Sequence, residues 1–152
     1  AHVSFAFSAH RAVVDVDQEL GLVKVVELIT SQDVGRVLNP LQLQGQLEGG
    51  AAQGLGLAVL EEINVVDGRI LNPSFTDYLL PTALDMPPVE IAALIEQPEP
   101  NAPFGAKGVG EPPAISSTAA IASAVRNATG LELQRVPIRP TDIVFPEKID
   151  ND

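Results

Sequence analysis

Residues 103–113 (PFGAKGVGEPP) restrict the local fold more than any other part of the chain. The three glycines, Gly105, Gly108 and Gly110, can adopt positive φ angles and let the backbone approach a neighbour or a ligand closely. Two prolines follow, and proline suits the first positions of a helix because its missing N–H would have no partner there. The sequence therefore predicts a flexible loop that ends at Glu111 and leads directly into a helix.

Behind the loop, residues 114–126 (AISSTAAIASAVR) are small or apolar at nearly every position. A helix without a polar face is a buried one, so we expect a buried helix here. A helix N-terminus exposes backbone N–H groups and carries a partial positive charge, which favours an anionic ligand. We hypothesise that the loop holds a cofactor or substrate and that Glu111 acts on it. The alternative is that Glu111 only complements the helix dipole, worth about 0.3–1 kcal/mol.

The composition limits the class of protein and of partner. A chain of 152 residues, 45% of them apolar, is long enough for one domain with a real core. The formal net charge of −11 argues against nucleic acid, because phosphate binding depends on clustered Lys and Arg. No apolar run is long enough to cross a membrane, and the lack of cysteine excludes disulfides and thiolate sites. The default location is the cytoplasm.

The N-terminal residues resemble neither a translation start nor a secretory signal. The chain begins at Ala1 and its single methionine is Met86. A secretory signal would need a charged region followed by an apolar one, and neither is present. We therefore expect a piece of a longer protein, a processed chain, or a chain that has lost its initiating methionine.

Hydrophobic periodicity and turn residues predict the order of the elements. Asn39 and Pro40 predict the N-cap and first residue of a long helix. Asp67 and Gly68 predict a type I′ turn, and Gly130 predicts the end of the second helix. The predicted elements are an antiparallel hairpin of strands over 3–16 and 22–30, a helix over 41–62, a hairpin over 65–71, a strand over 89–96, a helix over 114–126, and an edge strand or extended arm over 133–138.

These elements indicate an α+β fold. Antiparallel or mixed strands and hairpins pack with a glycine-rich helix and with a buried C-terminal helix. We expect one domain over residues 1–145 and a loose, charged tail over 146–152.

The long predicted helix contains five glycines, which is unusual because each costs about 1 kcal/mol relative to alanine. On a 3.6-residue period Gly45, Gly49, Ala52 and Gly56 share one narrow face, so another backbone or a flat ligand could approach the helix axis. Close packing of another helix is one explanation, and a cofactor lying against the face is the other. Gln53 lies at the edge of this face, where its amide could reach such a ligand.

Several common sites do not match. The loop lacks the Gly-Lys-Ser/Thr of a phosphate-binding P-loop, and its glycine spacing differs from the dinucleotide fingerprint. His2 and His10 have no carboxylate or second histidine at ligand spacing, so side chains of this chain are not expected to bind a metal. No Ser–His–Asp arrangement is supported.

Three stretches together resemble a known family. They are residues 33–56 (DVGRVLNPLQLQGQLEGGAAQGLG), 67–82 (DGRILNPSFTDYLLPT) and 105–113 (GAKGVGEPP). In this order and spacing they resemble the C-terminal part of the molybdenum-binding large subunit of the xanthine dehydrogenase/aldehyde oxidase family. The resemblance runs from about Val3 to about Val144 and implies a fragment of a much longer subunit.

The resemblance implies roles for particular residues. Glu111 would be the catalytic base in the oxidative hydroxylation of a purine, N-heterocycle or aldehyde at an electron-poor carbon. Gln53 would hydrogen-bond the cofactor, and Gly108, Val109 and Gly110 would contact it through backbone N–H groups. Lys107 is a further candidate because its ammonium could pair with an anion, although a lone loop lysine is ordinarily solvated.

The resemblance also implies cofactors and partners. The cofactor would be molybdopterin with molybdenum, in the cytosine dinucleotide form usual for bacterial members. The resemblance further implies that the enzyme takes part in purine catabolism. Iron–sulfur clusters and FAD would lie on partner subunits or domains of an oligomer, without nucleic acid or membrane. The isolated chain would be inactive, because the substrate-orienting residues lie in the remainder of the molybdenum subunit.

A non-catalytic binding or assembly domain remains the alternative, with the glycine face packing a helix. The enzymatic hypothesis expects the Glu111 carboxylate and the helix around Gly45–Gly56 to line one shared cavity.

Overall fold

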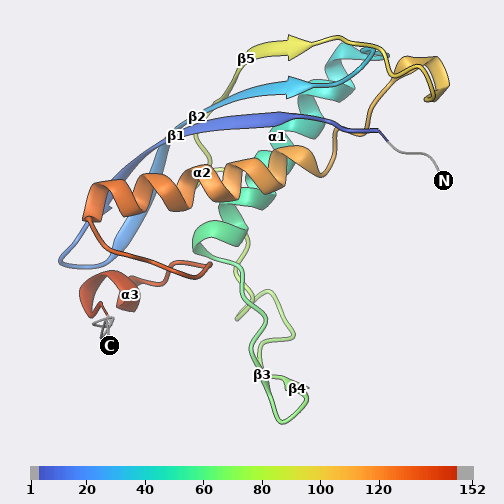
Figure 1. Ribbon diagram of the computed structural model, residues 1–152. Coiled ribbons are helices and arrows are strands. Elements are labelled where there is room, and N and C mark those ends of the chain that lie inside the picture. Colours follow the sequence, from blue (N-terminus) through green and yellow to red (C-terminus); the bar gives the residue numbers. More distant parts are fainter. Residues whose placement is uncertain (1–3, 147–152) are drawn as a thin grey trace, which may run out of the picture.

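The computed structural model describes residues 4–146, which form a three-stranded sheet, two long helices and a projecting arm (Figure 1). The predictions for residue 3 and for residues 147–152 of the tail lie outside the described residues. The elements are β1 (Ser8–Asp17), β2 (Leu22–Asp33), α1 (Pro40–Val59), β3 (Val65–Val66), β4 (Arg69–Ile70), β5 (Val89–Ile95), a 3-10 turn (Pro103–Gly105), α2 (Pro112–Thr129) and α3 (Pro140–Val144).

The sheet has the order β1-β2-β5, with β2 in the centre. β1 and β2 form the predicted antiparallel hairpin, but β1 begins only at Ser8, so the strand predicted over residues 4–7 is absent, and β2 continues past Thr30 to Asp33. β5 pairs with β2 in parallel. Asp17 closes the hairpin turn, since its Oδ1 accepts from the N–H groups of Glu19 and Leu20 at 3.0 and 2.9 Å. The sheet is therefore mixed and the fold α+β, as predicted.

α1 begins where the sequence predicted. Asn39 Oδ1 accepts a hydrogen bond from Gln42 N at 3.1 Å, and Pro40 is the first helical residue. The helix ends at Val59 rather than Glu62. The N–H groups of Leu60 and Glu61 both bond to Gly56 O, so the regular i→i−4 pattern stops after Leu60.

α2 lies along β1 and crosses α1 (Figure 1). The two helices meet at Gly50 and Gly54, not at the face defined by Gly45, Gly49, Ala52 and Gly56. A Cβ added at Gly50 would lie 2.8 Å from Pro113 Cβ, and one at Gly54 would lie 2.7 Å from Ala114 O. Gly45 and Gly49 face open space. The predicted glycine face is therefore wrong in its position. Close packing of another helix does occur, but it uses Gly50 and Gly54 instead of Gly45 and Gly49.

Apolar side chains between the helices and the sheet form the core. The largest cluster joins β2 to both long helices through Val25, Leu28, Leu55 and Ile121. A second cluster of Val34, Leu43 and Leu47 lies between the end of β2 and the start of α1, and a third of Val125, Ile138 and Ile143 lies under α3.

The prediction that α2 is buried all round is wrong. Only one face is buried, carrying Ala114, Ser117, Ile121 and Val125, whereas Ile115 is 72% exposed. Alanine and serine fit either environment, and a three-stranded sheet with one crossing helix covers only one side of α2. Gly130 ends the helix in the left-handed conformation, with φ 71°, as predicted.

The prediction of an edge strand or extended arm over 133–138 is wrong: these residues are irregular, with bends at 135–137. Pro137 has no N–H for a sheet ladder, and Ile138 N instead donates to Ala58 O at 2.7 Å. This contact links the C-terminal segment to α1. The short helix α3 follows, and nothing in the sequence analysis predicted it.

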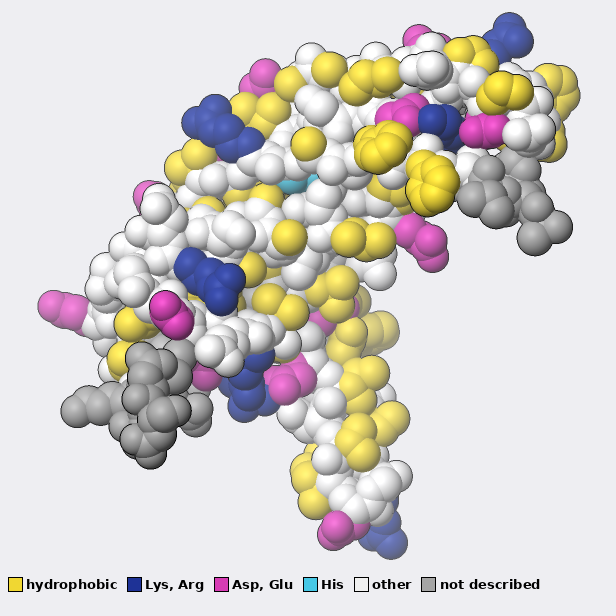
Figure 2. Space-filling view, in the orientation of Figure 1, with side chains coloured by type: hydrophobic (Ala, Val, Ile, Leu, Met, Phe, Trp, Pro, Cys, Tyr) yellow, Lys and Arg dark blue, Asp and Glu magenta, His cyan; other side chains and the backbone are white. Residues whose placement is uncertain are grey.

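The predicted hairpin over 65–71 forms, with the two residues Asp67 and Gly68 of its turn at φ 49° and 75°. It lies at the tip of the arm formed by residues 61–88, which projects from the sheet and helices (Figure 1). Figure 2 shows apolar side chains along this arm. Among residues 4–146, no helix is both long and apolar enough to span a membrane.

Two alanine substitutions within α1 should have opposite effects on stability. We expect Gly54→Ala to lower the free energy of unfolding by about 1–3 kcal/mol, because its methyl group would overlap Ser117 and the Ala114 carbonyl. The matched control Gly45→Ala meets open space and should raise it by up to about 1 kcal/mol through helix propensity. Urea unfolding measures both, and equal effects would contradict the packing described here.

Candidate functional site

The glycine loop is held against the segment that follows β2. Gly35 and Ala106 form an isolated antiparallel bridge. Lys107 N donates to Val34 O at 3.1 Å, and Arg36 N donates to Gly105 O at 3.0 Å. The first half of the loop is therefore fixed by backbone hydrogen bonds to residues 34–36.

A buried ion pair strengthens the same attachment. Lys107 Nζ lies 2.6 Å from Asp33 Oδ2, with only 10% and 9% of the two side chains exposed. Asp33 Oδ1 also accepts from Gly35 N at 3.3 Å. The ammonium of Lys107, a candidate for an anionic ligand, is thus engaged within the chain. Sequence analysis missed Asp33, although a carboxylate at the end of a buried strand is a signal for such a pairing.

The second half of the loop leaves its backbone donors free. Within residues 4–146 no hydrogen bond engages the N–H of Gly108, Val109, Gly110 or Glu111. A Cβ added at Gly108 would meet nothing within 4 Å, so the space beside this backbone is open. Consecutive free N–H groups of this kind can bind an anion or a carbonyl-rich ligand.

The start of α2 differs from the prediction. Pro112 and Pro113 have no N–H, and the first available one, on Ala114, donates to Glu111 O at 3.1 Å. The helix end therefore presents none of the free N–H groups that we expected from it. The free donors belong to the loop instead.

Glu111 stands at this junction with its side chain exposed. It occupies the N-cap position, but its side chain makes no capping hydrogen bond and its backbone is already helical, at φ −85° and ψ −39°. The Glu111 carboxylate has no hydrogen bond to any other residue in the described range 4–146. The carboxylate is consequently available for an external partner.

α1 lies directly beside the loop. A methyl group at Gly110 would lie 3.4 Å from Gln46 Oε1, and Gly50 contacts Pro113. Gln53 is exposed and follows Gln46 by seven residues, about two helical turns, on the same face of α1. Gln46 was missed by sequence analysis; its place two turns before Gln53 was the signal for it.

A hollow of about 200 Å³ lies between the loop and α1. Gln42 and Gln46 of α1, Lys107 and Val109 of the loop, and the segment over 34–39 contribute to its lining. Glu111 and Gln53 do not line it. Loop and helix thus share a hollow, but the cavity expected to include Glu111 itself is not enclosed by this chain.

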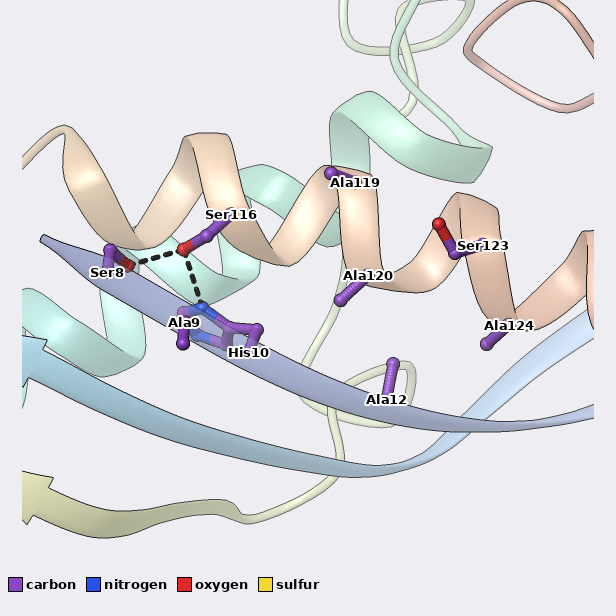
Figure 3. Close-up of a pocket in the computed structure, with 9 residues that line it drawn as sticks. All are labelled: Ser8, Ala9, His10, Ala12, Ser116, Ala119, Ala120, Ser123 and Ala124. Carbon is purple, nitrogen blue, oxygen red and sulfur yellow. Dashed lines mark hydrogen bonds between the residues drawn. The ribbon is translucent and has the colours of Figure 1, made fainter.

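A second, shallower hollow of about 510 Å³ lies between β1 and α2 (Figure 3). Ser116 Oγ lies 2.9 Å from Pro112 O, which can only accept, so the hydroxyl donates there and accepts from His10 Nδ1 at 2.8 Å. Ser8 Oγ also bonds to Ser116 Oγ. His10 Nε2 is buried and has no hydrogen-bond partner among the described residues.

One protein family matches more than half of this chain. Its sequence model, described as a molybdopterin cofactor-binding domain, matches residues 1–87. The chain belongs to this family. The matched residues include β1, β2, α1 and most of the 61–88 arm of this molybdopterin cofactor-binding domain.

Curated relatives and a solved structure agree with the assignment. The gamma subunit of the 6-hydroxypseudooxynicotine dehydrogenase complex of Paenarthrobacter nicotinovorans is 38% identical, over 93% of this chain and 18% of its own length. A putative xanthine dehydrogenase molybdenum-binding subunit of Escherichia coli is 40% identical, over 84% of this chain and 17% of its own length. Quinoline 2-oxidoreductase from Pseudomonas putida superposes with a TM-score of 0.81 at 37% identity, over 88% of this chain and 17% of that chain. The chain spans less than a fifth of these proteins.

The residues present fit a molybdopterin cofactor. Such a cofactor carries a phosphate group and a polar pterin, which need N–H donors and amide groups. The free N–H groups of residues 108–111 and the exposed amides of Gln46 and Gln53 supply both on neighbouring surfaces. The donor set therefore suits the cofactor of the family.

Removing the buried cation should destabilise the loop attachment. We expect Lys107→Met to lower the free energy of unfolding by about 3 kcal/mol, because it leaves the buried Asp33 carboxylate without a compensating positive charge. The matched control Lys24→Met, at an exposed position of β2, should change it by less than about 0.5 kcal/mol. In the double variant Asp33→Asn/Lys107→Met the loss should be smaller than the sum of the single losses. Additive losses in urea unfolding would argue against the pairing.

His10 should make stability depend on pH. Burial lowers the pKa of His10 below its ordinary value of 6.5. The unfolded chain then binds this proton more readily than the folded chain, so stability is complete above about pH 6.5 and falls as the pH drops below it. Urea unfolding of the wild type and of His10→Gln between about pH 8 and about pH 5 measures the effect. We expect the variant to lose less stability than the wild type; equal losses would exclude His10 as the cause.

Proposed function

We propose that this chain is the C-terminal cofactor-binding part of the molybdenum-binding subunit of a molybdenum hydroxylase. Residues 1–145 would form the domain, and the longer subunit would carry the remaining cofactor and substrate contacts. The observation that carries the proposal is the row of free N–H groups over 108–111, which ends at the exposed, unbonded Glu111. Family membership supports the identity of the ligand.

The chain's contribution to cofactor binding is made by two adjacent elements. Gly108, Val109 and Gly110 donate through the backbone, and Gln53 adds an amide from α1. Lys107 contributes indirectly, because its ion pair with Asp33 holds the loop that bears these donors. The cofactor, when bound, supplies the redox chemistry of the hydroxylation.

Glu111 is proposed as the general base. A base must lie within hydrogen-bond reach of the proton that it takes, and it needs a free oxygen to accept it. The carboxylate of Glu111 makes no hydrogen bond within residues 4–146 and follows directly on the cofactor-binding donors. It would take the proton from the oxygen that attacks an electron-poor carbon of the substrate.

The proposed enzyme acts on a purine, another N-heterocycle or an aldehyde. Matched relatives are named as acting on substrates of these classes: quinoline 2-oxidoreductase, xanthine dehydrogenase and aldehyde oxidoreductase. We further propose the cytosine dinucleotide form of the cofactor, iron–sulfur and FAD centres on partner subunits, a cytoplasmic location, a role in purine catabolism and no turnover by the isolated chain.

A non-catalytic assembly domain explains part of the same structure. It accounts for Gly50 and Gly54, which pack α2 closely. An assembly role does not explain why the N–H groups of residues 108–110 and the carboxylate of Glu111 are free of hydrogen bonds. The catalytic proposal therefore covers more of the observed features.

The base role predicts the effect of Glu111→Gln in the complete enzyme. The change keeps the side-chain shape but removes the proton acceptor, so kcat/KM should fall by about 10²–10⁴-fold while molybdenum and pterin content stay unchanged. The matched control Glu132→Gln makes the same change at an exposed site beyond the other end of α2 and should retain full activity. Steady-state kinetics and metal analysis test this together. Retained turnover in Glu111→Gln would rule out the base role.

A further inference from the structure

The arm over residues 61–88 has an inside-out distribution of side chains. Asn72 is its only buried residue, and all of its residues are described by the structure. Large apolar side chains are exposed along it, for example Phe75 at 78% and Leu84 at 92%. The others that are more than a third exposed are Ile63, Val65, Val66, Ile70, Leu71, Leu79 and Leu80.

Polar contacts, not a core, give the arm its shape. Asn72 Nδ2 donates to Glu62 O at 2.6 Å, and Asn72 Oδ1 accepts from Asn64 N at 2.9 Å. Tyr78 Oη donates to Glu61 Oε2 at 2.6 Å. The arm is therefore organised at its base, but an isolated two-stranded hairpin is at best marginally stable in water. A surface of this kind is typical of a segment that packs against another body.

We propose that the arm docks into the remainder of the molybdenum subunit, on an apolar groove rimmed by basic side chains. This rests on the proposed longer subunit. The alignment with the Paenarthrobacter relative covers 93% of this chain, which leaves too few residues outside it to omit the arm. That relative has about four-fifths of its length outside the matched region, on the same polypeptide. A covalently linked surface has a high effective concentration, which favours it over a separate chain.

The charges on the arm favour the same occupant over a second copy. Glu62 is already paired with Arg139 of the same chain. The arm therefore carries Glu61, Asp67, Asp77 and Asp85 against the single cation Arg69, and the chain has a net charge of −11. Pairing two arms would place like charges together, which costs free energy. A groove with Lys and Arg at its rim complements the arm instead.

Docking also connects the arm to the candidate site. The arm leaves the end of α1 and returns through β5, which pairs with β2 and leads to the glycine loop (Figure 1). The arm is therefore joined to two elements, α1 and β5, whose opposite ends lie beside the glycine loop.

Thiol labelling of the complete molybdenum subunit tests the proposal. This chain contains no cysteine, so Leu84→Cys and Val66→Cys each introduce a single thiol whose peptide is identified by mass spectrometry. Each variant is labelled with a maleimide in the native subunit and, as its own control, in urea. We expect native labelling to be slower than in urea by at least about tenfold at both sites. Two sites are used so that the test still stands if one variant fails to fold.

The alternative occupants give different results. Labelling at the unfolded rate in the isolated subunit, with protection only after the partner subunits are added, would overturn the proposal in favour of those subunits. Protection that disappears on dilution would point to a second copy and also overturn it. Labelling as fast as in urea under every native condition would show that the arm is free, which would also overturn the proposal. None of these labelling measurements depends on turnover. A result that contradicts docking of the arm would therefore not bear on the proposed base role of Glu111.

Discussion

The close contact of α1 with α2 positions the rest of the candidate site. Gly50 and Gly54 remove the side chains that would keep the helices apart, and Pro113 and Ser117 occupy the space. The helical cost of these two glycines, about 1 kcal/mol each, is offset by the contact that they permit. Because Glu111 lies between Gly110 and Pro113, which both approach α1, the same contact holds the backbone of Glu111 close to this helix.

The loop between β5 and α2 is held at both ends and free in the middle. The buried pair of Asp33 and Lys107, with the backbone bonds to residues 34–36, fixes its first half. The packing of Pro113 on Gly50 fixes its end. Residues 108–111 are thus ordered without using their own N–H groups, which is the condition that a backbone-lined ligand site requires. Preorganised donors bind a ligand without a further loss of loop entropy.

The chain exposes two surfaces of opposite character, and its share of the relatives' length accounts for both. The free donors beside Glu111 are polar and open, whereas the 61–88 arm is apolar and open. A segment that amounts to 17–18% of the matched relatives need not complete its own site or cover its own apolar arm. The core nevertheless closes locally, because Leu28, Leu55 and Ile121 join the sheet to both helices.

The sequence by itself determined the local elements and the family. The period-2 pattern of the first hairpin, the Asn39 cap and the Gly130 terminus depend on neighbouring residues, so they could be predicted. Three features could not be predicted. They are the helix contact at Gly50 and Gly54, the pairing of Asp33 with Lys107 across 74 residues, and the burial of only one face of α2. Each depends on how distant segments approach one another, and small side chains such as Ala, Ser and Gly carry no sequence signal for which face is covered. Only the tertiary structure decides that.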